Sequence, residues 1–417
     1  MNRGRYACIA FGLALALLAV GCSSNDDDAT PAVAPTEAVA PTEAPTPAPT
    51  EAPAPTPEPT PPPTPEPTPE PTPPPTPEPT PVPPIALTEF GEYLVGVTTL
   101  ELGDEPGQQP LSVWYPTVSE NLRGAEPEIY DSSQVIPDAF RALIPESMQS
   151  AVETNAYRDA LLADGPRYPV VIYSHGFGGH RDVAIFLTTH LASHGFIVAS
   201  PEHIHRNLPA QAFGTTEFSP EKDQADIANT LAALEGAGAF VGAVDTARVG
   251  VIGHSAGART ALDALANESV LAAIPLAGGG TAPPEAADKP ILVIVAELDL
   301  TVPTENSLAS YESAPGPRTF VSLAQAGHNS FTDSCPVILA GGGLGMLEPL
   351  LGAEQVARAE DGCTPEYADP LAMQAALKHL ATAFFLTNVA GRLDVAVNAE
   401  FADLIDGVEL ADYREAG

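Results

Sequence analysis

The stretch GHSAG, residues 253–257, places a serine between two glycines where an apolar run gives way to a helix-like pattern. A serine hydroxyl becomes a nucleophile only when a neighbouring base takes its proton, and a carbonyl must be able to reach it. A sharp turn between a strand (residues 248–252) and a helix (residues 257–267) exposes such a serine, and the glycines relieve crowding there. We therefore predict that Ser255 is a catalytic nucleophile; the alternative is a glycine-rich turn with an incidental serine.

A serine nucleophile also needs a base and an acid that orients the base. Two histidines follow Ser255 in the chain. His328 comes directly after a strand-like run, whereas His379 lies inside a helical pattern and is expected to be structural, so His328 is the predicted base. The run ILVIVAELD ends with two carboxylates: Asp299 is the predicted orienting acid, and Glu297 is the alternative.

Backbone N–H groups that are already in place stabilise an oxyanion well. One is expected from Ala256, which directly follows the nucleophile, and the other from Phe177 in the glycine-rich stretch 174–179. Those glycines let the backbone approach a substrate closely. A phosphate-binding interpretation is disfavoured because the chain has no GxxxxGK[ST] motif.

The elements that must position these residues alternate along the chain. Strand-like apolar runs alternate with helical patterns from residue 91 onward. The expected helices cover residues 182–195, 219–234, 257–267, 304–312 and 369–388. This alternation predicts an α/β fold with a mostly parallel sheet covered by helices on both faces, and Trp114 is expected in the core.

Two segments interrupt the alternation. Residues 116–168 show helical periodicity after Pro145, and residues 329–368 contain Cys335 and Cys363. Disulfides persist in oxidising compartments, so we predict a disulfide between these two cysteines. Two interpretations of each insertion stay open: it shapes the substrate site, or it only packs against the rest of the fold.

Four stretches carry a family resemblance: VVIYSHGFGG, LASHGFIVASPEH, RVGVIGHSAG and AGHNSFTD. Together they resemble the platelet-activating-factor acetylhydrolase and dienelactone-hydrolase-like branch of the α/β-hydrolase superfamily, over roughly residues 90–390. The resemblance implies an α/β-hydrolase fold with an eight-stranded, mostly parallel sheet and hydrolysis through an acyl-serine. The stretch AELDLTVP resembles the acid loop of bacterial polyester hydrolases and cutinases, which supports Asp299.

The N-terminal part of the chain does not resemble a folded domain. Residues 1–22 combine a basic start with a short apolar run, as in a signal peptide, and the last four resemble the lipobox of bacterial lipoproteins. That resemblance implies a lipid anchor on Cys22 and a place in the cell envelope; ordinary secretion with a free Cys22 is the alternative. Residues 23–84 repeat PTPEPTP and predict a disordered, extended linker, which leaves 85–417 for one catalytic domain.

The composition excludes some partners. A formal net charge of −37 disfavours nucleic acid and anionic membrane surfaces. His203 and His205 are potential metal ligands, but no further ligands stand at fitting spacing, so neither a metal nor another cofactor is expected.

These features together predict a lipid-anchored, extracytoplasmic serine esterase that acts on a small-molecule or lipid ester. The alternatives are a polyester or lipase-type hydrolase of the same fold, a peptidase, and a non-catalytic surface-binding module. The sequence does not specify the oligomeric state or the acyl chain length.

Overall fold

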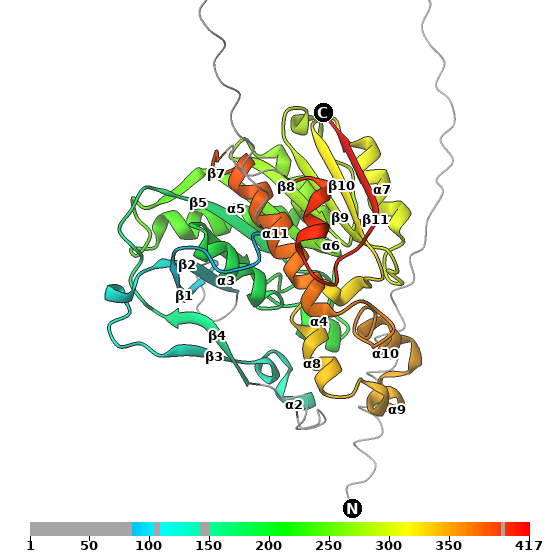
Figure 1. The fold of residues 1–417 in the computed structure, drawn as a ribbon. Helices are drawn as coiled ribbons and strands as arrows, with labels where there is room; N and C mark the ends of the chain where they lie inside the picture. Colours follow the sequence, from blue (N-terminus) through cyan, green and yellow to red (C-terminus); the bar gives the residue numbers. More distant parts are fainter. Residues whose placement is uncertain (1–85, 104–108, 142–150, 393–396) are drawn as a thin grey trace, which may run out of the picture. The chain divides into compact units, whose positions relative to one another are not determined.

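A computed structural model describes residues 86–103, 109–141, 151–392 and 397–417. The predicted signal peptide and linker lie outside these residues, as does Cys22. The described strands form a single 11-stranded sheet in the order β11-β10-β9-β8-β7-β5-β6-β2-β1-β4-β3 (Figure 1). Within the described part of the chain, none of the helices combines the length and the apolar character that crossing a membrane requires.

The strands vary from five to 11 residues in length. They are β1 (Leu94–Glu101), β2 (Pro110–Thr117), β3 (Pro127–Asp131), β4 (Ala151–Arg158), β5 (Tyr168–Ser174), β6 (Ile197–Pro201), β7 (Val244–His254), β8 (Val270–Leu276), β9 (Ile291–Ala296), β10 (Arg318–Leu323) and β11 (Leu410–Ala416).

The central six strands, from β10 to β6, pair in parallel. Antiparallel pairing joins β2 to both β1 and β6, β3 to β4, and β11 to β10. The predicted α/β fold with a mostly parallel core is therefore confirmed. The predicted strand number of eight is wrong: β3 and β4 extend one edge of the sheet, and β11 adds a strand at the other.

The helices vary more in length than the strands. They are α2 (Asp138–Arg141), α3 (Ile185–Ser193), α4 (Leu208–Ala212), α5 (Pro220–Gly236), α6 (Ala256–Asp263), α7 (Thr304–Ser313), α8 (Ser334–Ala340), α9 (Glu348–Leu351), α10 (Ala353–Ala359) and α11 (Pro370–Asn388). Short 3-10 helices occur at Ser119–Asn121, Ser132–Val135, Ala264–Ala266, Pro284–Ala286, His328–Phe331, Gly345–Leu347 and Ala399–Leu404.

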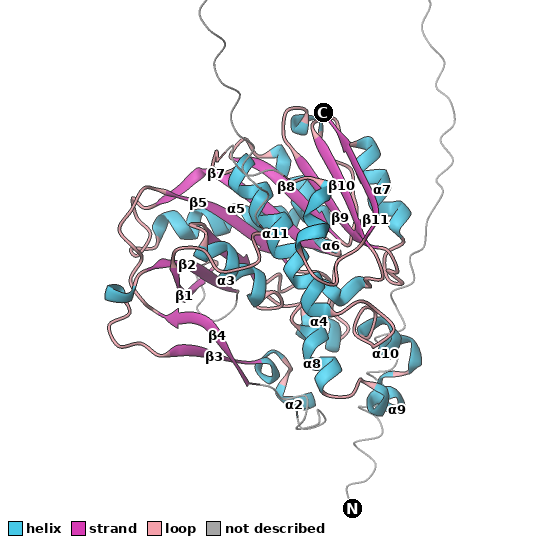
Figure 2. Cartoon of the chain, viewed as in Figure 1, coloured by secondary structure: helices cyan, strands magenta, loops and turns pink. Residues whose placement is uncertain are grey.

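Helices cover both faces of the sheet, as the alternation predicts (Figure 2). One hydrophobic cluster joins α3 and α11 to the sheet and includes Trp114. A second cluster, on the other face, contains side chains of α5, α6 and α7. At the start of α5, the side chain of Ser219 accepts a hydrogen bond from the N–H of Lys222, and Pro220 occupies the first turn.

The helical periodicity expected after Pro145 is wrong for Ala151–Arg158, which forms β4. Thr154 and Ala156 are buried and Glu153 and Asn155 are exposed, which is the period-two alternation of a strand. Pairing with β1 and β3 fixes this conformation, so tertiary contacts override the local pattern. Residues 142–150 lie outside the described residues.

Candidate active site

Ser255 occupies the sharp turn between β7 and α6. Its φ of 58° and ψ of −119° are uncommon for a residue with a side chain and are typical of strained functional positions. A Cβ on Gly253 would lie 1.8 Å from the carbonyl oxygen of Gly257, and a Cβ on Gly257 would lie 2.1 Å from a carbonyl oxygen of β5. Both glycines are therefore needed for the backbone to turn this tightly, and the predicted sharp turn between a strand and a helix is present.

His328 and Asp299 form a buried pair. The Nδ1–H of His328 donates to Asp299 Oδ2 at 2.8 Å, and the two side chains are only 6% and 3% exposed. The other carboxylate oxygen of Asp299 accepts from the N–H groups of Thr301 and Val302, at 2.9 and 2.6 Å. These bonds fix both the rotation of the carboxylate and the orientation of the imidazole.

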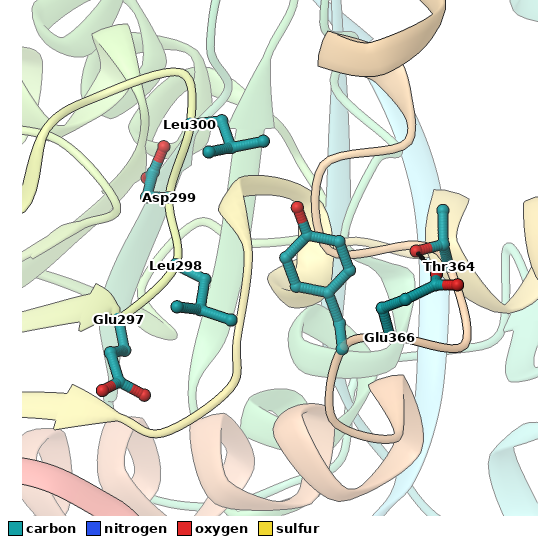
Figure 3. A pocket seen from close by; sticks show the side chains of 7 residues that line it. Glu297, Leu298, Asp299, Leu300, Thr364 and Glu366 are labelled. Carbon is teal, nitrogen blue, oxygen red and sulfur yellow. Dashed lines mark hydrogen bonds between the residues drawn. The ribbon is translucent and has the colours of Figure 1, made fainter.

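Glu297, the alternative acid, does not contact His328. Its Oε2 accepts from the backbone N–H of Gln325 at 2.9 Å, and its carboxylate points away from Asp299 (Figure 3). The structure thus brings Asp299, and not Glu297, to the histidine.

His254 connects the turn at Ser255 to the loop of His328. Its Nε2–H donates to the carbonyl of His328 at 2.9 Å, and the two rings are 4.7 Å apart. Burial lowers the pKa of His254 to about 3, so this imidazole stays neutral and keeps a single N–H for the bond. The contact between His254 and His328 could not be predicted from the sequence. The only indication was that a histidine directly precedes Ser255.

Among the described residues, the hydroxyl of Ser255 has no hydrogen bond to the ring of His328. Such bonds between nucleophile and base are often long before substrate binds and tighten in the complex. The contact through His254 places Ser255 and His328 at one site.

The glycine-rich loop after β5 lies against Ser255. A Cβ on Gly176 would be 2.8 Å from Cβ of Ser255. The N–H groups of Gly178 and Gly179 are used within the fold, by the carbonyls of Arg206 and Gly176. Phe177 precedes them in this loop, and Ala256 begins α6, so both predicted oxyanion donors belong to backbone segments next to Ser255.

A buried arginine donates hydrogen bonds to the residues that begin this loop. Arg206 is fully buried, and its guanidinium donates to Asp223 at 2.9 Å, to Ser174 Oγ at 3.0 Å and to the carbonyl of His175. The His175 ring in turn donates from Nδ1 to the carbonyl of Gly176 at 2.8 Å. A buried charge that is paired and hydrogen-bonded in this way holds a loop firmly.

His203, Asp223 and Asp226 are close enough together to raise the question of a metal. Both ring nitrogens of His203 already have partners, because Nδ1 donates to Asp226 at 2.7 Å and Nε2 accepts from Ser174 Oγ at 2.9 Å. Burial raises the pKa of Asp223, but the hydrogen bond from His205 and the charge of Arg206 outweigh it and bring the pKa to about 2. The donor atoms that a metal would need are thus occupied by a network that already contains a cation.

The second insertion reaches the site. The predicted disulfide between Cys335 and Cys363 is present. A pocket of about 620 Å³ lies between the acid loop and this insertion (Figure 3). Its lining consists of Glu297, Leu298, Asp299, Leu300, Thr364, Glu366 and Tyr367. The insertion therefore forms a wall beside Asp299, while its role in the substrate site stays a prediction.

Two family models match the chain. The model of platelet-activating factor acetylhydrolase, isoform II, matches residues 88–233, and the PET hydrolase-like model matches residues 162–344. A solved ferulic acid esterase from Streptomyces cinnamoneus is similar with a TM-score of 0.58 and 24% identity, over 77% of this chain and 97% of that one.

Curated relatives match more locally. The platelet-activating factor acetylhydrolase of Gallus gallus is 28% identical over 144 residues, which are 32% of this chain and 34% of the relative. That of Cavia porcellus is 30% identical over 119 residues, 27% of each chain. The matched part thus spans about a third or less of these relatives' length.

The sheet order, the serine turn and the solved neighbour identify an α/β-hydrolase fold. The two family models overlap over residues 162–233, and the chain is similar to both of them over the ranges that they match.

Proposed function

We propose that this protein is a serine hydrolase that cleaves carboxylic esters. The observation that carries the proposal is the buried His328–Asp299 pair, joined through His254 to the strained turn that presents Ser255. The matches to acetylhydrolase and PET hydrolase-like models support an ester as the substrate.

The proposed reaction has two halves. Ser255 Oγ attacks the ester carbonyl carbon while His328 Nε2 takes the hydroxyl proton, and Asp299 stabilises the imidazolium that forms. The N–H groups of Phe177 and Ala256 hold the oxyanion. The C–O bond then breaks as His328 returns the proton to the leaving alcohol. Water, deprotonated by His328, attacks the acyl-serine, and His328 gives this proton to Ser255 Oγ as the acid leaves.

A polyester is the second candidate substrate. The PET hydrolase-like match covers residues 162–344, so it includes Ser255, Asp299 and His328. The same acyl-serine chemistry would then act on ester bonds of a polymer chain, and release of soluble monomers from a polyester film tests this directly.

For location, we keep the lipoprotein interpretation as part of the proposal. It rests on the lipobox-like residues that end at Cys22 and on the Pro/Thr/Glu-rich segment after them. A lipid-modified Cys22 would place the enzyme in the cell envelope, and metabolic labelling with a fatty acid, compared with Cys22→Ser, tests it.

Hydrolysis of p-nitrophenyl esters from acetyl to palmitoyl tests the activity. We expect turnover that Ser255→Ala abolishes, whereas Ser313→Ala, at an exposed serine on α7, keeps it. The preferred chain length would separate a small-acyl enzyme from a lipase-like one. A folded protein without activity on any ester would overturn the esterase proposal and favour an amide substrate or a binding role.

A further inference from the structure

Asp361 lies in the disulfide-bearing insertion and is 1% exposed. One of its carboxylate oxygens, Oδ1, accepts from the backbone N–H of His328 at 3.1 Å. The other, Oδ2, accepts from the N–H of Leu300 at 2.9 Å and from Thr301 Oγ1 at 3.0 Å. A single buried carboxylate thus joins the loop of the predicted base to the loop of the predicted acid.

The backbone around Asp361 strengthens this junction. Its carbonyl accepts from the N–H of Asn329 at 2.8 Å. A Cβ on Gly327 would lie 2.3 Å from the nitrogen of Gly362, so only a glycine allows the insertion to approach the residue before His328 this closely. The insertion is therefore packed directly against the histidine loop.

The acid loop is held from two sides. Asp299 Oδ1 accepts from the N–H groups of Thr301 and Val302, while Asp361 accepts from Leu300 and from the Thr301 hydroxyl. Because the N–H donors of this turn are divided between two carboxylates, Asp299 Oδ2 remains directed at His328. Loss of Asp361 would release the turn on the side that faces the insertion.

The disulfide restrains the segment of the fold that contains Asp361. Cys363 is two residues away, and its bond to Cys335 ties the segment to α8, which follows the histidine loop. The insertion has a small hydrophobic core of its own around the disulfide. Its members are Cys335, Ile338, Leu344, Val356 and Cys363.

We propose that Asp361 is a positioning residue for the His328–Asp299 pair and that the Cys335–Cys363 disulfide holds it in place. Asp361 acts on the reaction through these two residues and not by contact with the substrate. The assignment deepens the proposed function and relies on it for the kinetic readout alone.

Asp361→Asn is the main test, because the amide has nearly the same shape but can accept on one side only. We expect kcat on the preferred p-nitrophenyl ester to fall by about 10- to 100-fold with KM changed less than about 3-fold, since small misplacements of catalytic groups cost this much. Glu348→Gln, at an exposed carboxylate of the same insertion, is the matched control and should keep wild-type kcat.

A spectroscopic signature makes the test independent of turnover. The proton on Nδ1 of His328, bonded to Asp299, should give a low-field proton NMR signal that Asp299→Asn removes. In Asp361→Asn this signal should broaden or vanish, and in Glu348→Gln it should remain. Wild-type protein without esterase activity would overturn the proposed function, while an Asp361-dependent signal would still support the positioning role.

Two milder variants cover the case in which Asp361→Asn does not fold. Thr301→Val removes one of the bonds to the Asp361 carboxylate, and we expect a fall in kcat of about 3- to 10-fold. Cys335→Ser with Cys363→Ser should change kcat in the same direction. Unchanged kcat and an unchanged low-field signal in these variants, or a loss in Asp361→Asn that tracks only the melting temperature, would overturn the proposal.

Discussion

At the scale of single residues, the two carboxylate oxygens of Asp299 have different hydrogen-bond partners. Oδ1 binds the N–H groups of its own turn, and Oδ2 binds the imidazole of His328. A carboxylate can accept on both sides at once, whereas an amide cannot. The bond to Oδ2 favours the tautomer of His328 that carries its proton on Nδ1 and leaves Nε2 unprotonated.

Asp299→Asn should therefore abolish most of the activity. We expect kcat to fall by about 10⁴-fold, because an amide NH₂ facing Nδ1 favours the wrong tautomer of the base. Steady-state kinetics on the preferred p-nitrophenyl ester measures this. Glu297→Gln changes the same charge two residues away and should stay within about 3-fold of wild type; a larger loss there than in Asp299→Asn would reverse the assignment of the acid.

The approach of Gly176 to Ser255 gives another prediction at this scale. A methyl group in Gly176→Ala would meet Cβ of Ser255 at 2.8 Å, so the loop or the serine must move. We expect kcat to fall by about 10- to 100-fold with the melting temperature within a few degrees of wild type. Gly236→Ala is the control, because nothing lies within 4 Å of the added atom. Equal activity in both variants would show that this contact does not matter for catalysis.

At the scale of elements, a buried ionic layer lies between the end of β5 and helix α5. Arg206 donates to Asp223 of α5 and to Ser174 at the end of β5. Removing one member of such an ion pair leaves its partner charged and buried. This lowers stability more than replacing both members with apolar side chains.

Arg206→Met should reduce the free energy of unfolding by about 3–5 kcal/mol, because the carboxylate of Asp223 loses its buried partner. Urea unfolding followed by circular dichroism measures the change. Arg358→Met removes a guanidinium whose side chain is 46% exposed and should change stability by less than about 1 kcal/mol. Similar losses in the two variants would contradict the structural importance of the buried layer.

The start of α3 depends on Asp333, whose carboxylate accepts from the N–H of Ile185. Burial raises the pKa of Asp333 to about 7, although the hydrogen bonds from Ile185 and Phe186 oppose the shift. The unfolded chain would titrate near 4, so between about pH 4 and pH 7 the folded state binds more protons. Stability contributed by the protonated group is therefore lost as pH rises through this window.

Asp333→Asn keeps a hydrogen-bond acceptor for Ile185 but cannot titrate. We expect the wild type to lose stability relative to this variant between about pH 4 and pH 7, measured as the difference in free energy of unfolding at each pH. Parallel pH profiles for the two proteins would show that Asp333 does not titrate in this range.

At the scale of the whole molecule, the central part of the fold could be predicted from sequence, and the edges could not. The apolar runs of β5, β7 and β9 are buried on both faces, and they can be recognised as strands from their composition. Strand β4, next to the edge strand β3, and the edge strand β11 are partly exposed and polar, and their conformation is set by the strands they pair with.

The residues of the candidate site also differ in whether the sequence predicts them. Ser255, His328 and Asp299 follow strand ends, so their positions could be predicted to converge, although their catalytic roles remain proposals. Asp361 could not be found from sequence, because its bonds reach residues 33 and 61 positions away and its insertion has no strand–helix pattern. Apart from its place before Ser255, nothing in the sequence around His254 indicates that its ring contacts the loop of His328.

The most direct test of the central claim is to trap the proposed acyl-serine position. The purified protein would be treated with a fluorophosphonate, which reacts with activated serines, and digested for peptide mass spectrometry while ester hydrolysis is followed in parallel. We expect one phosphonyl group per chain on Ser255, with esterase activity lost in proportion, and no label in Ser255→Ala. Ester turnover that persists with Ser255 fully labelled, or a label on a different residue that tracks the loss of activity, would contradict it.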